Sequence, residues 1–275
     1  MSRTKVVGRL SLVLALTLLL LPNAAGAASA NDRGLLMLAG HHVKWGGLDY
    51  GSRAEVTYAF LTERHSFAGA RNCGEMTGIA DLLAPAGIAP PSLDREVAAA
   101  FGLWARAANL RFTRVSDMAA ADIVIGAQAG STGVAFTNVF QEKTAAGPMD
   151  GIGKATICLD PSERWEAGID GDPRTYNLRY VLAHEIGHAI GLDHRGRDHG
   201  VMGFAYQEKV ASPGEIHLAD TDVAAAVRLY GPAAGEPGAT VVAQLPRQPV
   251  LSSCSAGEPA TAGPVAACGL TASGD

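Results

Sequence analysis

The most informative stretch of this sequence is His184-Glu-Ile-Gly-His-Ala-Ile-Gly-Leu-Asp-His194, which predicts a helix and a metal site. His184 and His188 stand four residues apart, so in a helix both imidazoles lie on one face, one turn apart. Gly191 can adopt the left-handed conformation that ends a helix, and the following turn can bring His194 back toward the first two rings. The spacing predicts a helix over about 175–190 that presents three imidazoles to one metal ion.

The residue types in this stretch suit zinc chemistry. Three neutral imidazoles leave the charge of Zn²⁺ uncompensated and one coordination position open for water. Glu185 follows the first histidine and can take a proton from that water and deliver it to a leaving amine. The odds of this pattern arising by chance are on the order of 10⁻⁵, so histidines without a metal are the weaker interpretation. We expect one catalytic zinc ion on His184, His188 and His194, with Glu185 as general base.

Five strands and two further helices are expected around this helix. β-branched and aromatic residues predict strands, and apolar residues three and four positions apart predict helices. The strands are expected at 55–61, 110–115, 121–126, 134–140 and 155–159. The helices are expected at about 92–108 and 221–229, with Gly231 and Pro232 ending the second. Residues 63–91 are rich in Gly, Ala and Pro and are expected to form a long loop.

The two ends of the chain differ from its middle part. Residues 1–9 carry three positive charges, residues 10–21 are uncharged and mostly apolar, and small residues follow up to Ala27. This pattern is typical of a cleaved signal peptide, and the apolar run is shorter than the roughly 20 residues of a membrane anchor. The expected organisation is a signal peptide (1–27), a short N-terminal segment (28–44), one globular domain (45–232) and a flexible Ala/Gly/Pro-rich tail (233–275).

Charge and cysteine content narrow the class of protein. The net charge is −5, and loss of three basic residues with the signal peptide makes it −8. An acidic chain argues against nucleic acid as a partner. The even number of cysteines in an exported chain indicates disulfides, with three possible pairings. Domain membership favours Cys73–Cys158 and Cys254–Cys268.

The histidine stretch resembles the signature of the metzincin metallopeptidases, H-E-x-x-H-x-x-G-x-x-H followed by a methionine turn. Met202 lies eight residues beyond His194, and Tyr206 follows four residues later, which is similar to the matrixin branch, the matrix metalloproteinases. The resemblance covers about residues 45–232. It implies an α+β fold with a twisted five-stranded mixed sheet and three main helices. It also implies that Met202 lies beneath the zinc and that Asp222 supports the methionine turn.

The resemblance further implies a secreted zinc-dependent endopeptidase that hydrolyses extended polypeptides outside the cell or in a periplasm. We expect a monomer without a membrane anchor. The strand at 134–140 resembles a free sheet edge to which a substrate peptide adds as one more strand. Phe204, Ala205 and Tyr206 are expected to wall the pocket just after the cut, where an apolar side chain would fit. The alternative is that Phe204 and Tyr206 are ordinary core residues.

The chain also departs from the matrixin pattern. Arg195 stands where the family carries Ser or Thr, and no histidine lies between His65 and His184 to hold the family's second zinc. Calcium is possible, but no motif supports it. Cys73 follows the first strand instead of preceding the domain, which argues against a cysteine that silences a zymogen. A zinc-binding protein without activity and a structural extracellular module are the rival interpretations, and the intact Glu185 argues against the first.

Overall fold

A computed structural model of the chain describes residues 32–144, 147, 149–168, 172, 174–196, 200–204, 216–234, 255–256 and 265–268. The expected signal peptide and most of the expected tail lie outside these residues. In the described part of the chain, no helix has the length and hydropathy needed to cross a bilayer.

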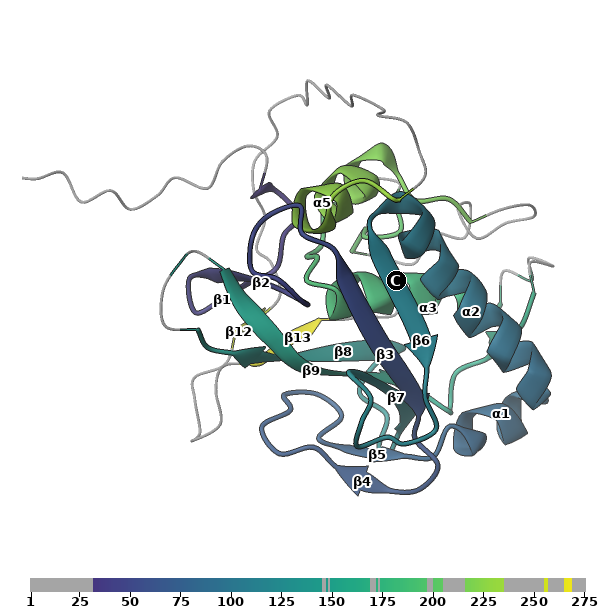
Figure 1. The fold of residues 1–275 in the computed structure, drawn as a ribbon. Coiled ribbons are helices and arrows are strands. Elements are labelled where there is room, and N and C mark those ends of the chain that lie inside the picture. The colour runs from purple at the N-terminus through teal and green to yellow at the C-terminus, as the bar shows by residue number, and fades with distance from the viewer. Residues whose placement is uncertain are drawn as a thin grey trace, which may run out of the picture.

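The five expected strands form the body of one twisted sheet in the order β8-β9-β7-β3-β6 (Figure 1). Their bounds are β3 Ala54–Phe60, β6 Leu110–Arg114, β7 Ile123–Gln128, β8 Ala135–Glu142 and β9 Met149–Leu159. β8 is antiparallel to β9, and the other neighbours in this order are parallel. The expected mixed sheet of an α+β fold is therefore confirmed.

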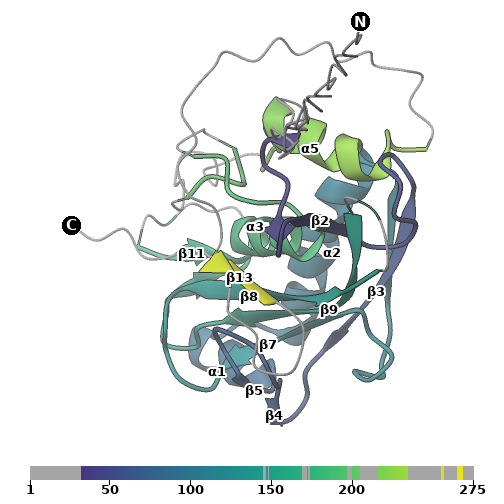
Figure 2. The same cartoon turned by 90° about the vertical axis from the view of Figure 1, so that its left-hand side faces the viewer.

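Helices α2 (Pro90–Ala107) and α3 (Leu178–Ala189) lie side by side against one face of this sheet (Figures 1 and 2). The buried Trp104 of α2 donates its indole N–H to the Ala183 carbonyl of α3 over 2.8 Å. Helix α5 (Asp220–Tyr230) follows and ends at Gly231, as expected. A shorter helix, α1 (Ala80–Ala86), lies inside the expected long loop and contains Pro85.

Several short strands extend the sheet. They are β1 Met37–Leu38, β2 His41–Lys44, β4 His65–Ser66, β5 Glu75–Thr77, β12 Ser255–Ala256 and β13 Val265–Cys268. A separate parallel pair consists of β10 Trp165–Glu166 and β11 Tyr176–Asn177. Each has two to four residues, too few to show a periodic pattern in sequence, which is why none was expected.

The sequence predicted a separate N-terminal segment at 28–44. Its described residues, 32–44, pack against the domain. β2 pairs in parallel with the start of β9, and Leu35, Leu36, Leu38 and Val43 are buried in the main core. The expected disulfide between Cys73 and Cys158 is confirmed. Cys268 also takes part in a disulfide, but its expected partner Cys254 lies outside the described residues, so that pairing stays a prediction.

The edge of the sheet at β8 differs from the expectation. β13 pairs antiparallel with β8 at four successive positions, from Val265 opposite Phe140 to Cys268 opposite Thr137. β12 pairs in turn with β13. The outer side of β8, expected to be free, is therefore occupied at residues 137–140 by a strand from the expected tail.

Candidate metal centre

Helix α3 carries the first two histidines and starts and ends on its own local signals. The Asn177 side chain caps its N-terminus by accepting a hydrogen bond from the Tyr180 N–H over 3.0 Å. At the other end Gly191 has a φ of +92°, and the Leu192 N–H reaches back to the Gly187 carbonyl over 2.9 Å. This left-handed termination satisfies the last carbonyls of the helix and turns the chain toward His194.

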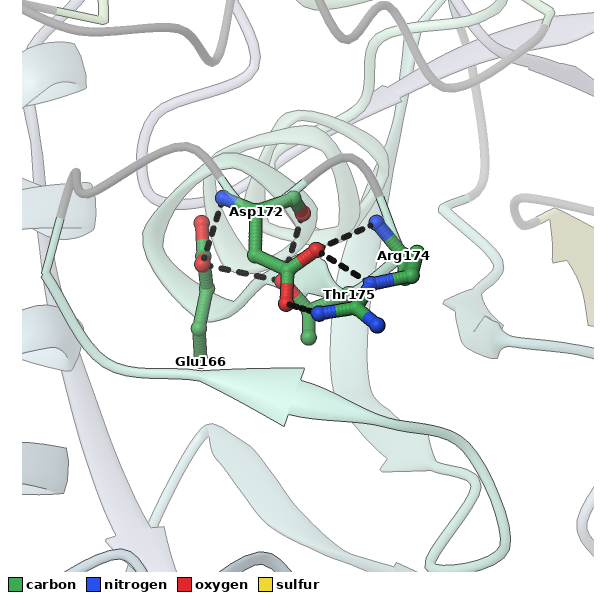
Figure 3. Close-up of polar contacts among 4 residues, drawn as sticks. All are labelled: Glu166, Asp172, Arg174 and Thr175. Atoms are coloured by element: carbon green, nitrogen blue, oxygen red, sulfur yellow. Dashed lines mark hydrogen bonds and ion pairs between the residues drawn. The ribbon is translucent and has the colours of Figure 1, made fainter.

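The loop before α3 is held by a small polar network (Figure 3). Glu166 accepts hydrogen bonds from the Asp172 N–H at 3.3 Å and the Thr175 hydroxyl at 2.9 Å. The Asp172 carboxylate accepts three bonds from Arg174, and these bonds lower the pKa of Asp172 to about 2. Glu166 also accepts a 3.4 Å bond from the side-chain amide of the cap residue Asn177, so the network ties the loop to the start of α3.

Three imidazoles meet at the end of α3. The Nε2 atom of His188 lies 3.0 Å from that of His184 and 3.3 Å from that of His194, and the remaining pair is 3.2 Å apart. Nδ1 of His184 faces the Val201 carbonyl at 2.6 Å, and Nδ1 of His188 faces the Leu192 carbonyl at 2.9 Å. A carbonyl oxygen only accepts, so both Nδ1 atoms carry the proton and both Nε2 lone pairs point into the cluster.

Burial keeps these rings uncharged. It lowers the pKa of His184 to about 3, with the nearby His194 adding to the effect, and it lowers the pKa of His194 to about 4. Burial and the two neighbouring rings also hold the pKa of His188 well below its ordinary value. All three are therefore neutral bases at neutral pH, which is the form that binds a metal.

The donor set fits zinc. Tetrahedral zinc with nitrogen ligands at about 2.0–2.1 Å places those nitrogens roughly 3.3 Å from one another. The observed separations of 3.0–3.3 Å match this, and the set supplies three ligands, the number typical of a catalytic site. Carbonyl groups behind two of the rings fix their orientation, as in many metal sites.

Glu185 lies next to His184 on α3 and is fully buried. Its carboxylate accepts a hydrogen bond of 2.7 Å from the hydroxyl of Thr137 on β8. The same hydroxyl lies 3.0 Å from the Glu185 carbonyl. Thr137 thereby joins the sheet edge to the carboxylate, and no pattern in the sequence had pointed to it.

Met202 packs against α3, the helix that carries His184 and His188. Its side chain is 1% exposed and packs against Gly187, where a Cβ atom would overlap Met202 Sδ and lie 2.9 Å from Trp104 Cζ2. Asp222 of α5 holds this turn, because its Oδ2 atom accepts the Val201 N–H at 2.9 Å and the Ala219 N–H at 3.1 Å. Asp222 thus supports the turn at Val201–Met202, and the role of Met202 beneath a bound metal stays a prediction.

The residues beyond Met202 are partly described. Phe204 packs its ring against His194, with centroids 4.5 Å apart. Ala205 and Tyr206, the other expected wall residues, lie outside the described residues. Arg195 donates from Nη1 to the carbonyls of Arg33 and Thr221, so it joins the N-terminal segment to the start of α5.

Comparison with known proteins agrees with this architecture. The profile of the family described as matrixin matches residues 84–231, more than half of the chain. The chain is 34% identical to matrix metalloproteinase-20 of Homo sapiens over 143 residues and 33% identical to interstitial collagenase of Sus scrofa over 149 residues. Each match covers 51% of this chain but only 28% of the relative. Matrilysin of Homo sapiens is 30% identical over 143 residues, which is 51% of each chain.

Proposed function

The chain belongs to the matrixin family, and on that premise we propose that it is a secreted zinc-dependent endopeptidase acting on extended polypeptides. The observation that carries the proposal is the convergence of three neutral imidazoles within 3.3 Å of one another. The buried Glu185 carboxylate on the same helix adds the acid–base group that a site for storing metal would not need. The names of the relatives, a collagenase and a matrilysin among them, agree with the activity.

Different residues of the chain would have different roles in peptide hydrolysis. His184, His188 and His194 would hold the metal through Nε2. A bound zinc ion supplies Lewis acidity and lowers the pKa of a water molecule at its open position to about 7. Glu185 takes a proton from the attacking water and gives it to the amine nitrogen as the C–N bond breaks. The Thr137 hydroxyl keeps the Glu185 carboxylate in place throughout.

A preference for apolar side chains just after the cut belongs to the same proposal. Phe204 packs against the third histidine and so borders the site on that side. That Ala205 and Tyr206 continue this wall is part of the proposal. A fluorogenic peptide library varied at the position after the cut measures this preference. Selection of a charged residue there, or a need for a free peptide terminus, would contradict it.

Metal analysis and peptide cleavage test the proposed activity together. The purified protein should hold one zinc ion and cleave unfolded polypeptide, and a chelator should abolish cleavage. His194→Ala should lose zinc, whereas Glu185→Ala should keep zinc and lose about 10²–10⁴-fold in rate. Undiminished cleavage by Glu185→Ala would refute its role, and bound zinc without cleavage by the unaltered chain would favour a non-enzymatic zinc protein.

Export is proposed from the first 27 residues. N-terminal sequencing of the secreted protein tests this step, and it should find Ala28 as the first residue. A retained N-terminus would contradict cleavage after Ala27.

A further inference from the structure

The strand β13 lies beside β8, on the side of β8 away from β9 (Figure 2). It pairs antiparallel with β8, from Val265 opposite Phe140 to Cys268 opposite Thr137. Thr137 is also the residue whose hydroxyl holds the Glu185 carboxylate. The end of β13 therefore lies at the point of β8 that touches the proposed catalytic base.

Cys268 shows that this end of the strand is packed against the domain. Its side chain is 3% exposed and belongs to the main hydrophobic core. The sulfur is in a disulfide. Residues from the C-terminal region thus reach into the domain beside the site.

Main-chain groups along the outer side of β8 are what an extended peptide would use to bind as an added strand. At residues 137–140 those positions are paired with β13. A segment tethered to the same molecule competes at an effective concentration that reaches millimolar values. A substrate peptide must therefore displace β13 before it can pair with this part of β8.

We propose that Val265–Cys268 is a built-in inhibitor that occupies the place of substrate on β8 and leaves when the enzyme becomes fully active. This inference rests on the proposed peptidase function. The shortness of the contact favours it over a permanent extra strand, because β13 has four residues and only two of them pair with β12. Such a small two-stranded unit is marginally stable alone, so it can be displaced.

Proline substitutions in the full-length secreted protein test the proposal. Ala266→Pro and Ala267→Pro each remove one backbone N–H from β13. Successive N–H groups of a strand point to opposite sides, so one of the two variants loses a hydrogen bond to β8. That variant should raise kcat/KM for a fluorogenic peptide by roughly tenfold, mainly through a lower KM. Ala239→Pro, in the C-terminal region but outside both strands, is the control and should leave kcat/KM unchanged.

Two further measurements do not depend on turnover. Amide hydrogen exchange should report protected amides at residues 137–140 in the full-length protein and faster exchange there in the activated variant. In a Glu185→Ala background, a fluorescent substrate peptide should bind roughly tenfold tighter once the proline is present. A third measurement does use turnover: an excess of a synthetic peptide of residues 252–270 should inhibit the proline variant competitively.

The outcomes separate this inference from the proposed function. If full-length protein and both proline variants cleave equally well with equal KM, the inhibitor is refuted and the peptidase stands. If none of them cleaves, the peptidase is refuted, and peptide binding still decides whether β13 covers a peptide site. Unchanged binding and unchanged exchange in both proline variants would overturn the inference.

Discussion

At the scale of single residues, sequence patterns did not reveal the hydrogen bond from the Thr137 hydroxyl to the Glu185 carboxylate. A buried carboxylate needs hydrogen-bond donors to hold its charged form and its position. The 2.7 Å bond from Thr137 supplies one, and it comes from the sheet instead of from α3 itself. Thr137 is therefore a positioning residue for the proposed base.

Thr137→Val replaces the hydroxyl by a methyl group of similar shape and removes this donor. We expect kcat to fall roughly 10-fold with unchanged zinc content, a loss in the range typical of groups that orient a site. Thr137→Ser should restore most of the rate, which a purely structural role would not require. Thr156→Val is the matched control, because Thr156 is also buried and bonds Asn138 at 3.2 Å. A rate loss in the control as large as in Thr137→Val would argue against positioning.

Gly187→Ala tests the contact between α3 and Met202. Glycine to alanine inside a helix ordinarily stabilises by about 1 kcal/mol. Here the new Cβ would overlap Met202 Sδ and lie 2.9 Å from Trp104 Cζ2, and such overpacking costs about 1–3 kcal/mol. We expect a net loss of unfolding free energy and weaker zinc binding.

Gly102→Ala in α2 is the matched control for Gly187→Ala. A Cβ there meets only the movable end of Arg106, at 3.0 Å. Urea titration of both variants measures their unfolding free energies, and Gly102→Ala should be neutral or stabilising. Equal behaviour of the two variants would contradict the tight packing at Gly187.

At the scale of elements, α5 supports the turn at Val201–Met202 through one carboxylate, that of Asp222. Asp222→Ala leaves the N–H groups of Val201 and Ala219 without their partner. Each buried unpaired group costs about 1–3 kcal/mol, so we expect a loss of roughly 2–4 kcal/mol and a lower affinity for zinc. Asp220→Ala removes a neighbouring acid from the same helix turn, but this residue is exposed. Thermal unfolding should show a larger loss of stability for Asp222→Ala than for Asp220→Ala. Similar losses in both variants would indicate an effect of negative charge on the helix dipole instead of the hydrogen bonds.

At the scale of the whole molecule, zinc is expected to tie α3 to the loop that carries His194. Metal that binds only the folded state at 100 times its Kd stabilises by about 2.7 kcal/mol. For a domain of this size that corresponds to a fall in Tm of roughly 5–10 °C on chelation. Calorimetry with and without chelator measures it. The same chelator should leave the Tm of His194→Ala almost unchanged, and an equal fall there would show an effect unrelated to this centre.

Local spacing in the sequence was sufficient for a large part of the fold and the site. The 3.6-residue period placed His184 and His188 on one helix face, and Gly191 ended that helix, because both effects act within a few residues of chain. The five long strands were also expected, since each shows its own pattern. The mixed order of the sheet came from resemblance to a family and not from periodicity.

Tertiary structure alone decided the contacts between distant segments. Thr137 meets Glu185 across 48 residues, and β13 meets β8 although more than 120 residues separate them. Neither leaves a local signal, because a hydroxyl in a strand and a run of Val-Ala-Ala-Cys are compatible with many environments. Hydrogen bonding along a sheet edge uses main-chain groups that every residue carries, so sequence does not specify which segment fills that edge. The sequence by itself determined the three histidines proposed as metal ligands, and only the folded chain determined what holds the proposed base and what covers the edge of the sheet.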